Sequence, residues 1–193
     1  MRGARPRSVR PPSVAVVIPS PAPRDTHRTR VYRAEDAWAA QLDAARLGAA
    51  RATVAGSAVL LPAERRFGTL DGAAGYAGRV LGLPEVTAVF GPVAGPELRV
   101  RRGTRKAHWE PPGVVALPVP KHGEPWALRE SVLLHELAHH VAAGTGRPVD
   151  HGPGFPAVLL LLVRAALGAE AELALRVAYG QERVDVGGIG VGA

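Results

Sequence analysis

The segment from Trp126 to Ala143 constrains the fold of this chain more than any other. It reads WALRESVLLHELAHHVAA, and its apolar side chains recur at helical spacing on nearly every side. Pro125 suits the first turn of such a helix, and Gly144 suits its end. Because a helix that is apolar all round is buried, we expect this segment to form a central helix against which other elements pack.

The same helix contains the pattern HExxH, formed by His135, Glu136 and His139. Residues four apart lie about 40° apart around a helix and one turn along it, so both imidazoles can reach one metal ion. Glu136 lies one position further round and can take a proton from a water on that metal. Buried histidine and glutamate side chains need partners, which a zinc ion would provide. Histidines satisfied without a metal, in the core or at the surface, are the alternative.

A third ligand must come from outside this pattern, because a catalytic zinc takes three protein ligands. The next histidine, His140, points about 140° away from His135 around the helix, so it cannot share the metal. We expect a structural role for His140. A metzincin would have Gly at 142 and His at 145, whereas this chain has Ala142 and Thr145, which excludes that class.

Four acidic or histidine side chains further along the chain are candidates for the third ligand. His151 lies twelve residues after His139, beyond a loop rich in Gly and Pro that could fold it back, and we favour it. A glutamate of a later helix, Glu170 or Glu172, is an open alternative. The neighbouring Asp150 is another.

The 193-residue chain has no cysteine, which excludes disulfides, cysteine–zinc sites and thiol catalysis. Any transition-metal site must therefore use His, Asp or Glu. The absence of disulfides fits a reducing compartment, and we expect a cytoplasmic protein. The longest apolar run, residues 155–163, has about half the length that a bilayer requires, so no membrane span is expected.

The net charge of +7 originates at the N-terminus. Residues 1–33 carry eight arginines and one aspartate, and acidic and basic residues balance in the remainder. The composition predicts a disordered Arg/Pro-rich arm at residues 1–28, one folded domain at 29–183 and a flexible glycine-rich tail at 184–193. The arm and a basic hairpin at 99–106 could contact nucleic acid. An exposed hairpin protected by its charges is the simpler interpretation of the second segment.

The other segments predict an α+β fold. Helices are expected at residues 31–50, near 72–81, at 156–167 and at 169–179, and strands at Val86–Phe90, at 113–119 and in a 97–109 hairpin that turns at Gly103-Thr104. The order of helix, strands and then helices is typical of α+β proteins rather than of alternating βαβ units. We expect a small antiparallel or mixed sheet before the buried helix and C-terminal helices after it.

The segments HELAHH and DHGPGF resemble the SprT/Spartan-like zinc metallopeptidases. In that family HExxH is followed, after a short loop, by a histidine, a glycine and an aromatic residue, which here are His151, Gly152 and Phe155. The segments RDTHRTRVYRAED, GVVALPV and WALRESVLLHELAHH also resemble a family of HExxH metallohydrolases from actinobacteria. The first resemblance covers about residues 113–155 and the second most of 24–180. The zinc ribbon of many SprT-like proteins is missing, because the chain has no cysteine.

These resemblances imply a zincin-like fold with one zinc ion, Zn2+. His135, His139 and His151 would be its ligands, and Glu136 would be the general base. The implied reaction is the hydrolysis of a peptide bond in a peptide or protein substrate. A non-catalytic zincin-fold module, regulatory or associated with nucleic acid, is the alternative.

The resemblance also implies where an extended substrate would bind. In zincins an edge strand above the helix pairs with the substrate, and here that strand would be 113–119 or the 97–109 hairpin. The sequence assigns no oxyanion donor with certainty. His108, at the end of a strand, is a candidate, although a structural role is the simpler interpretation of this residue.

Overall fold

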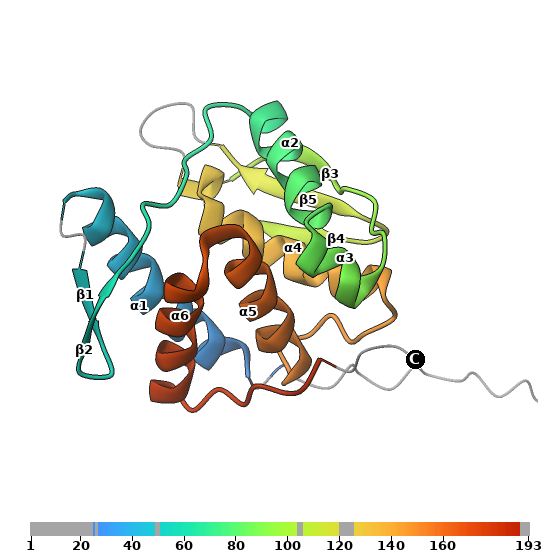
Figure 1. The fold of residues 1–193 in the computed structure, drawn as a ribbon. Coiled ribbons are helices and arrows are strands. Elements are labelled where there is room, and N and C mark those ends of the chain that lie inside the picture. Colours follow the sequence, from blue (N-terminus) through green and yellow to red (C-terminus); the bar gives the residue numbers. More distant parts are fainter. Residues whose placement is uncertain (1–24, 26, 49–50, 104–105, 120–125, 190–193) are drawn as a thin grey trace, which may run out of the picture.

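The computed structural model describes residues 25, 27–48, 51–103, 106–119 and 126–189 (Figure 1). Its helices are α1 (Arg28–Arg46), α2 (Leu70–Leu81), α3 (Pro84–Phe90), α4 (Glu130–Gly144), α5 (Gly154–Leu167) and α6 (Ala169–Gln181), with a 3-10 helix η1 (Trp126–Leu128). Its strands are β1 (Arg51–Val54), β2 (Ser57–Leu60), β3 (Glu97–Arg101), β4 (His108–Glu110) and β5 (Val114–Pro118). The α+β class predicted from the sequence is confirmed. Thr104 of the predicted turn and most of the N-terminal arm lie outside the described residues.

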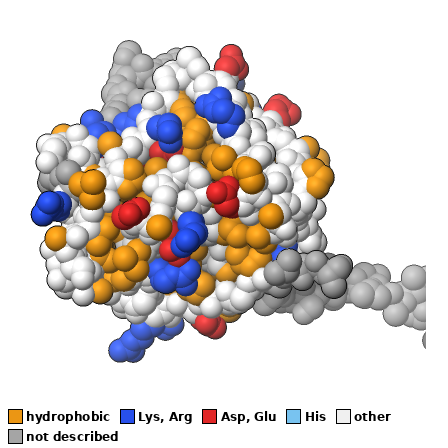
Figure 2. All heavy atoms as spheres, viewed as in Figure 1, with side chains coloured by type: hydrophobic (Ala, Val, Ile, Leu, Met, Phe, Trp, Pro, Cys, Tyr) orange, Lys and Arg blue, Asp and Glu red, His pale blue; other side chains and the backbone are white. Residues whose placement is uncertain are grey.

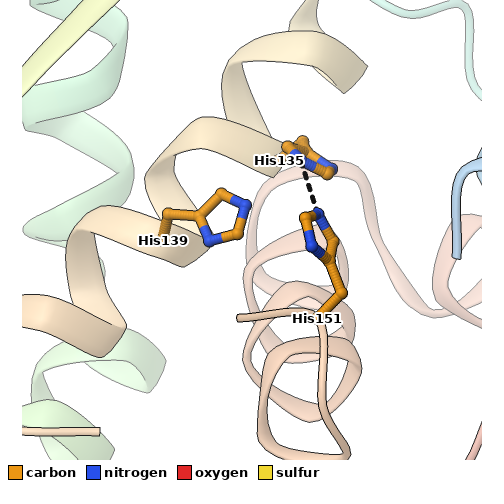
Figure 3. A group of neighbouring side chains, drawn as sticks. All are labelled: His135, His139 and His151. Carbon is orange, nitrogen blue, oxygen red and sulfur yellow. Dashed lines mark hydrogen bonds between the residues drawn. The ribbon is translucent and has the colours of Figure 1, made fainter. Parts of the chain in front are cut away.

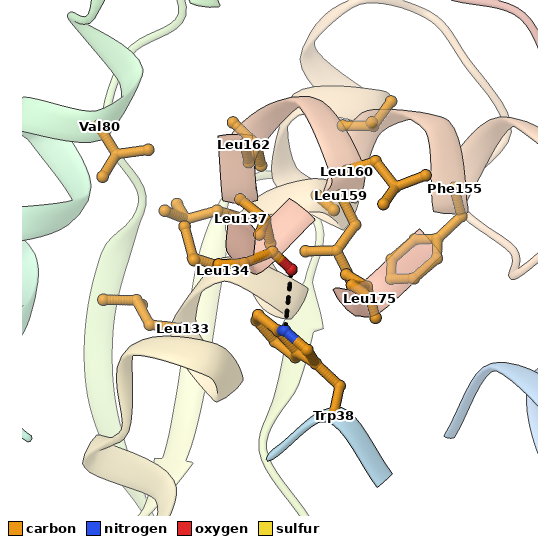
Figure 4. Packing of buried hydrophobic residues seen from close by; sticks show 14 of the residues in the cluster. Trp38, Val80, Leu133, Leu134, Leu137, Phe155, Leu159, Leu160, Leu162 and Leu175 are labelled. Carbon is orange, nitrogen blue, oxygen red and sulfur yellow. Dashed lines mark hydrogen bonds between the residues drawn. The ribbon is translucent and has the colours of Figure 1, made fainter. Parts of the chain in front are cut away.

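Helix α4 is buried along most of its length, as its apolar pattern predicts. It contacts α5, α2 and β4; α5 packs on α6, and α6 packs on α1. Leu133, Leu134 and Leu137 of α4 lie in one core with side chains from α5 and α6 (Figure 4). Trp38 of α1 joins this core, and its indole N–H donates to the carbonyl of Ala171 over 3.1 Å. The core therefore fixes α4 relative to α1 and to the C-terminal helices α5 and α6.

The three-stranded sheet is mixed, with β5 in its centre. β3 runs parallel to β5, and β4 runs antiparallel to it. The predicted 97–109 hairpin is therefore wrong, because β5 lies between the two strands that would have formed it. The prediction that 113–119 could be an edge strand is also wrong. Val115, Ala116 and Leu117 are fully buried, and such an apolar run suits a central strand, while the charged β3 and the short β4 form the edges.

The predicted strand at Val86–Phe90 is helical and belongs to α3. Pro84 stands in the first turn of this helix, where its fixed φ favours helical geometry. The hydroxyl of Thr87 donates to the carbonyl of Leu83 over 3.2 Å, and Val86 is buried against the core. Local start signals and one buried contact therefore outweigh the β propensity of this short segment.

A small hairpin precedes α2, in a stretch whose residue pattern predicts neither helix nor strand clearly. Val54 of β1 pairs with Ser57 of β2, which leaves a two-residue turn of Ala55 and Gly56. Both turn residues have positive φ, at 49° and 83°. This is the geometry of a type I′ turn, and glycine at the second position adopts it without steric cost.

The start of α4 is held by buried charges. Glu130, the first residue of α4, is fully buried. Its carboxylate accepts hydrogen bonds from the backbone N–H of Arg65 over 2.8 Å and from the hydroxyl of Tyr76. The guanidinium of Arg129 donates to the buried carboxylate of Glu64 over 2.5 Å. The segment before α2 therefore clamps the N-terminus of α4.

Removing the cation from this clamp should destabilise the fold. In Arg129→Met the Glu64 carboxylate, whose side chain has no exposed area, loses its charged partner. We expect the free energy of unfolding to fall by about 3–5 kcal/mol, the usual cost of an uncompensated buried charge. Urea denaturation followed by circular dichroism measures this loss. The double variant Arg129→Met with Glu64→Leu should recover part of it, and equal stability of Arg129→Met and wild type would contradict the clamp.

The described part of the C-terminal tail contacts the body. Val184 is buried, and the backbone N–H of Gly187 donates to the carbonyl of Pro153 over 2.8 Å. A Cβ at Gly187 would lie 3.0 Å from that carbonyl oxygen, so glycine permits the close approach. The last four residues of the predicted tail lie outside the described residues. Within the described part of the chain, no helix has both the length and the apolar character needed to cross a membrane.

Candidate metal centre

The structure brings together three histidines that sequence analysis proposed as ligands. One ring nitrogen from each of His135, His139 and His151 lies within 4.8 Å of the others, and all three side chains are buried. Figure 3 shows the first two on α4 and the third on the loop before α5, with their rings facing one space. The Nε2 atoms of His135 and His151 are 3.4 Å apart. This buried group could hold a metal ion.

The alternative third ligands do not join the cluster. Asp150 uses its Oδ1 to accept the backbone N–H of Gly152 over 2.9 Å. Glu172 is occupied by Arg176, whose Nε donates to it over 2.7 Å. Glu170 is exposed in the first turn of α6. Among the described candidates, His151 alone reaches the two histidines of α4.

The loop between α4 and α5 turns the chain back so that His151 faces α4. Gly146 has a φ of 69°, in the left-handed region that favours glycine. The backbone N–H of Arg147 donates to the carbonyl of Ala142 over 2.8 Å, which closes the end of the helix. A Cβ on Gly152 would lie 2.9 Å from Oδ1 of Asp150, so glycine there lets the Asp150 turn form. These local features bring a residue twelve positions away back to the same helix.

Each histidine has a second partner away from the cluster. Nδ1 of His135 lies 2.7 Å from the carboxylate of Glu35, and Nδ1 of His151 lies 2.6 Å from that of Asp25. The ring of His139 donates a hydrogen bond to the backbone carbonyl of Val149. Each carboxylate accepts a hydrogen bond from the N–H at Nδ1, and in the neutral ring this leaves the Nε2 lone pair directed at the shared space. This is the arrangement found around metal-binding histidines.

Two aromatic rings enclose the histidines. Phe155 lies against all three rings, with centroid distances of 4.8 Å to His135, 4.4 Å to His139 and 4.8 Å to His151. Tyr32 stacks on His135 at 5.3 Å with an interplanar angle of 18°. These rings pack against the imidazoles, which restricts their motion and reduces the access of water to them.

The protonation of the histidines follows from burial and from their neighbours. Burial, together with the other two histidines, lowers the pKa of His139 to about 2. Burial also lowers the pKa of His151, and its bond to Asp25 only partly offsets this. Burial opposes the charge on His135 as well, but the carboxylate of Glu35 outweighs it and raises the pKa of that ring. Neutral imidazoles at His139 and His151 suit a divalent metal, and a bound cation would favour the neutral form of His135 as well.

Glu136 lies next to the ligands but outside their set. Its side chain is 3% exposed, and its carboxylate accepts a hydrogen bond from the backbone N–H of Trp109 in β4. Burial raises the pKa of this carboxyl above its ordinary value. A carboxylate in these surroundings takes up a proton more readily than an exposed one.

An open cleft of about 280 Å³ begins at His135 and Glu136 and runs between α1 and α4. Its apolar wall comes from Trp38, Ala39, Ala107, Trp126 and Val132, and its polar groups are Tyr32, Glu35, Asp36, Lys106 and Ser131. Clefts that combine an apolar wall with a few polar groups are typical binding sites for organic ligands. The cleft therefore reaches the candidate metal centre at His135 and Glu136.

The fourth histidine of the segment has the structural role that was expected. His140 is buried on another face of α4, and its Nε2 donates to the carbonyl of Ala94 over 2.7 Å. Its Nδ1 accepts the indole N–H of Trp109 over 3.3 Å. His140 thereby attaches β4 to α4. The same strand, β4, supplies the backbone N–H of Trp109 that bonds to Glu136.

His108 is not among the residues that line the cleft. Its ring lies between Arg101, at 2.9 Å, and Glu110, at 2.5 Å, on the edge strands. The structure therefore provides no evidence that His108 stabilises an oxyanion.

Sequence reasoning missed Asp25, Tyr32 and Glu35 as parts of this site. Asp25 fell in the predicted disordered arm, although its carboxylate contacts His151. Glu35 lies in the helix expected at residues 31–50, and its carboxylate contacts His135. The spacing of Tyr32 and Glu35, three residues apart, predicts only that they are neighbours on one face of a helix. It does not reveal which part of the chain that face contacts.

No protein-family model matches this chain, and it matches no curated protein and no solved structure. The resemblance to SprT-like and actinobacterial metallohydrolases therefore stays an expectation from the sequence. What the protein does has to be inferred from the side chains of the site.

Proposed function

We propose that the protein is a zinc-dependent hydrolase that cleaves peptide bonds. The observation that carries the proposal is the convergence of three buried histidines beside Glu136 at the inner end of an open cleft. Structural metal sites are closed by four protein ligands, whereas a catalytic site keeps a free position for water. In the described part of the chain the cluster has three such ligands, which favours a catalytic site.

Zinc is the proposed metal because of the donor atoms. The chain has no cysteine, and the three donors are imidazole nitrogens, which suit zinc better than calcium or magnesium. A zincin-like fold is part of the proposal and is supported by the contact of α4 with the edge strand β4. His135, His139 and His151 would be the zinc ligands.

The proposed chemistry divides the work between the metal and Glu136. Zinc, when bound, would polarise the scissile carbonyl and lower the pKa of the attacking water. Glu136 would take a proton from that water and then deliver it to the leaving nitrogen. The N–H of Trp109 holds the Glu136 carboxylate in place while its burial favours proton uptake. Phe155 keeps bulk water away from the ligands on the inner side.

The cleft supports a substrate with an apolar side chain beside the scissile bond. Val132 and Trp126 line it next to His135 and Glu136. In Val132→Arg, we expect kcat/KM for peptides with an apolar residue there to fall about 10–100-fold, since pocket contacts of this size discriminate by such factors. Competition between peptides in a library measures the change. Val100→Arg, at an exposed position of β3, is the control, and an unchanged profile in Val132→Arg would place the substrate elsewhere.

The non-catalytic alternative depends on free basic groups. Two arginines of the 99–106 segment are used within the protein: Arg99 binds the carboxylate of Glu110 at 2.6 and 2.7 Å, and Arg101 donates to the carbonyl of Lys106 over 2.6 Å. On the face that carries α5 and α6, basic side chains are dispersed among acidic and apolar ones (Figure 2). Both observations favour the hydrolase over a nucleic-acid module within the described residues.

The proposal is tested by metal analysis together with cleavage of a peptide library. We expect one zinc per chain after purification without chelator, cleavage of a subset of the peptides, and loss of cleavage after dialysis against a chelator. Zinc at full stoichiometry with no cleavage of a broad library would favour the binding-module alternative. Absence of zinc from the purified protein and failure to take it up would reject the proposal.

A further inference from the structure

Asp25 and residues 27–35 form one wall of the histidine cluster, although they are 100 or more residues away from it in sequence. Asp25 contacts His151, and Glu35 contacts His135. Tyr32, between them, stacks on His135 and lies 5.2 Å from His151, measured between ring centroids. Three side chains of one short segment thus contact His135 and His151, whose Nε2 atoms are 3.4 Å apart.

Asp25 uses both carboxylate oxygens to join two parts of the chain. Oδ2 pairs with Nδ1 of His151 at 2.6 Å and also accepts the backbone N–H of His151 over 3.2 Å. Oδ1 accepts the backbone N–H of Arg28, the first residue of α1, over 3.0 Å. The side chain therefore fixes the start of α1 to the loop that carries the third ligand.

Glu35 joins three helices in a similar way. Its Oε2 pairs with Nδ1 of His135 on α4 at 2.7 Å, and its Oε1 accepts the hydroxyl of Tyr179 on α6 over 3.1 Å. Both oxygens are occupied, so the carboxylate has a defined orientation toward the imidazole. Further along α1, Trp38 and Leu42 are buried in the core, which holds the second half of the helix without help from the cluster.

We propose that metal binding and the docking of residues 25–35 stabilise each other, with Asp25 and Glu35 as positioning residues for His151 and His135. A carboxylate at Nδ1 fixes the ring so that its Nε2 lone pair faces the metal and increases its basicity. A metal at Nε2 in turn makes the Nδ1 proton a stronger donor to the carboxylate. Coupling between two such events is reciprocal, so each must favour the other by the same factor. This inference rests on the proposed metal site but does not require hydrolysis.

The first test measures zinc affinity by competition with a chromogenic chelator. Asp25→Asn and Glu35→Gln should each bind zinc about 10–100-fold more weakly than wild type, the usual effect of losing the outer partner of a ligand. Asp71→Asn, which changes an exposed carboxylate in the first turn of α2, is the matched control and should bind as wild type does. Unchanged affinity in both Asp25→Asn and Glu35→Gln would overturn the proposal.

The second test reads the docking of the segment without any reference to activity. Arg28, Arg30 and Arg33 are exposed trypsin sites in the first turns of α1, and Arg46 is an exposed site at its other end. Zinc should slow cleavage at the first three sites about 10-fold or more and leave cleavage at Arg46 unchanged. In Asp25→Asn, at zinc concentrations that saturate the variant, this protection should be smaller. Mass spectrometry identifies the cut sites and their rates.

The outcomes separate this inference from the proposed function. Wild-type protein that takes up no zinc would reject both. Wild-type protein that binds zinc, with equal cleavage at Arg28, Arg30 and Arg33 in the presence and absence of the metal, would reject the coupling and leave the metal centre standing. Equal zinc protection at Arg46 would show a general stabilisation of the fold and would also overturn the proposal.

Discussion

Replacing Glu136 with glutamine should reduce kcat/KM for a cleaved peptide about 10³-fold while the zinc content stays at the wild-type level. A general base contributes about 10²–10⁴-fold to such a reaction. Glutamine has the same size, and its amide oxygen can still accept the N–H of Trp109, but it cannot take a proton from water. Initial rates with a peptide from the library, combined with metal analysis of the same sample, measure both quantities.

The control for this variant is Glu170→Gln. Glu170 is an exposed glutamate of α6 and was a candidate third ligand, so its variant should retain both activity and zinc. If Glu136→Gln hydrolyses peptides at the wild-type rate, another group must act as the base. A loss of zinc from Glu136→Gln would mean that this carboxylate supports the ligands, and the kinetic result would then not report on catalysis alone.

The second large effect is expected for His151→Ala. This change removes a proposed ligand and leaves Asp25 without its imidazole partner. Loss of an outer partner alone is expected to weaken zinc binding about 10–100-fold. The zinc affinity of His151→Ala should fall by more than that. Chelator competition gives the affinity, and circular dichroism checks that the helices persist. The expected order of zinc affinity is wild type, then Asp25→Asn, then His151→Ala.

Asp150→Asn is the matched control, since Asp150 is the neighbouring candidate ligand. Asparagine can keep the hydrogen bond from the N–H of Gly152, so we expect an affinity close to that of wild type. An affinity loss in Asp150→Asn as large as that in His151→Ala would move the third ligand to the aspartate. Wild-type affinity in His151→Ala would remove His151 from the site altogether.

Local periodicity explains why α4 could be predicted from the sequence. The spacing of His135 and His139 follows from helix geometry alone, and the same geometry placed His140 on a different face. The one error in this region is at Arg129, which has extended backbone with φ −90° and ψ 147° and separates η1 from α4. A bridge to Arg66 holds that residue extended, and no local pattern reveals a partner so far away in the chain.

Tertiary contacts explain what the sequence could not predict. Whether β3 pairs with β4 or with β5 depends on which strand is the most buried, and hairpin signals describe only neighbours in sequence. Asp25 and Glu35 are 126 and 100 residues from the histidines they contact. In the sequence these two residues cannot be told from ordinary surface carboxylates, because a polar side chain that faces buried histidines leaves no apolar pattern. The three histidines of the cluster could therefore be predicted from the sequence, and the carboxylates that contact them could not.

The contact of Asp25 with His151 affects how a shortened form of this protein should be made. Composition places the end of the N-terminal arm at residue 28, and a chain trimmed there would lack the carboxylate that orients the third ligand. Such a protein could keep its helices and still be recovered with little metal, and its inactivity would then be misattributed to the site itself. A chain that begins at residue 24 removes nearly all of the arm and keeps Asp25.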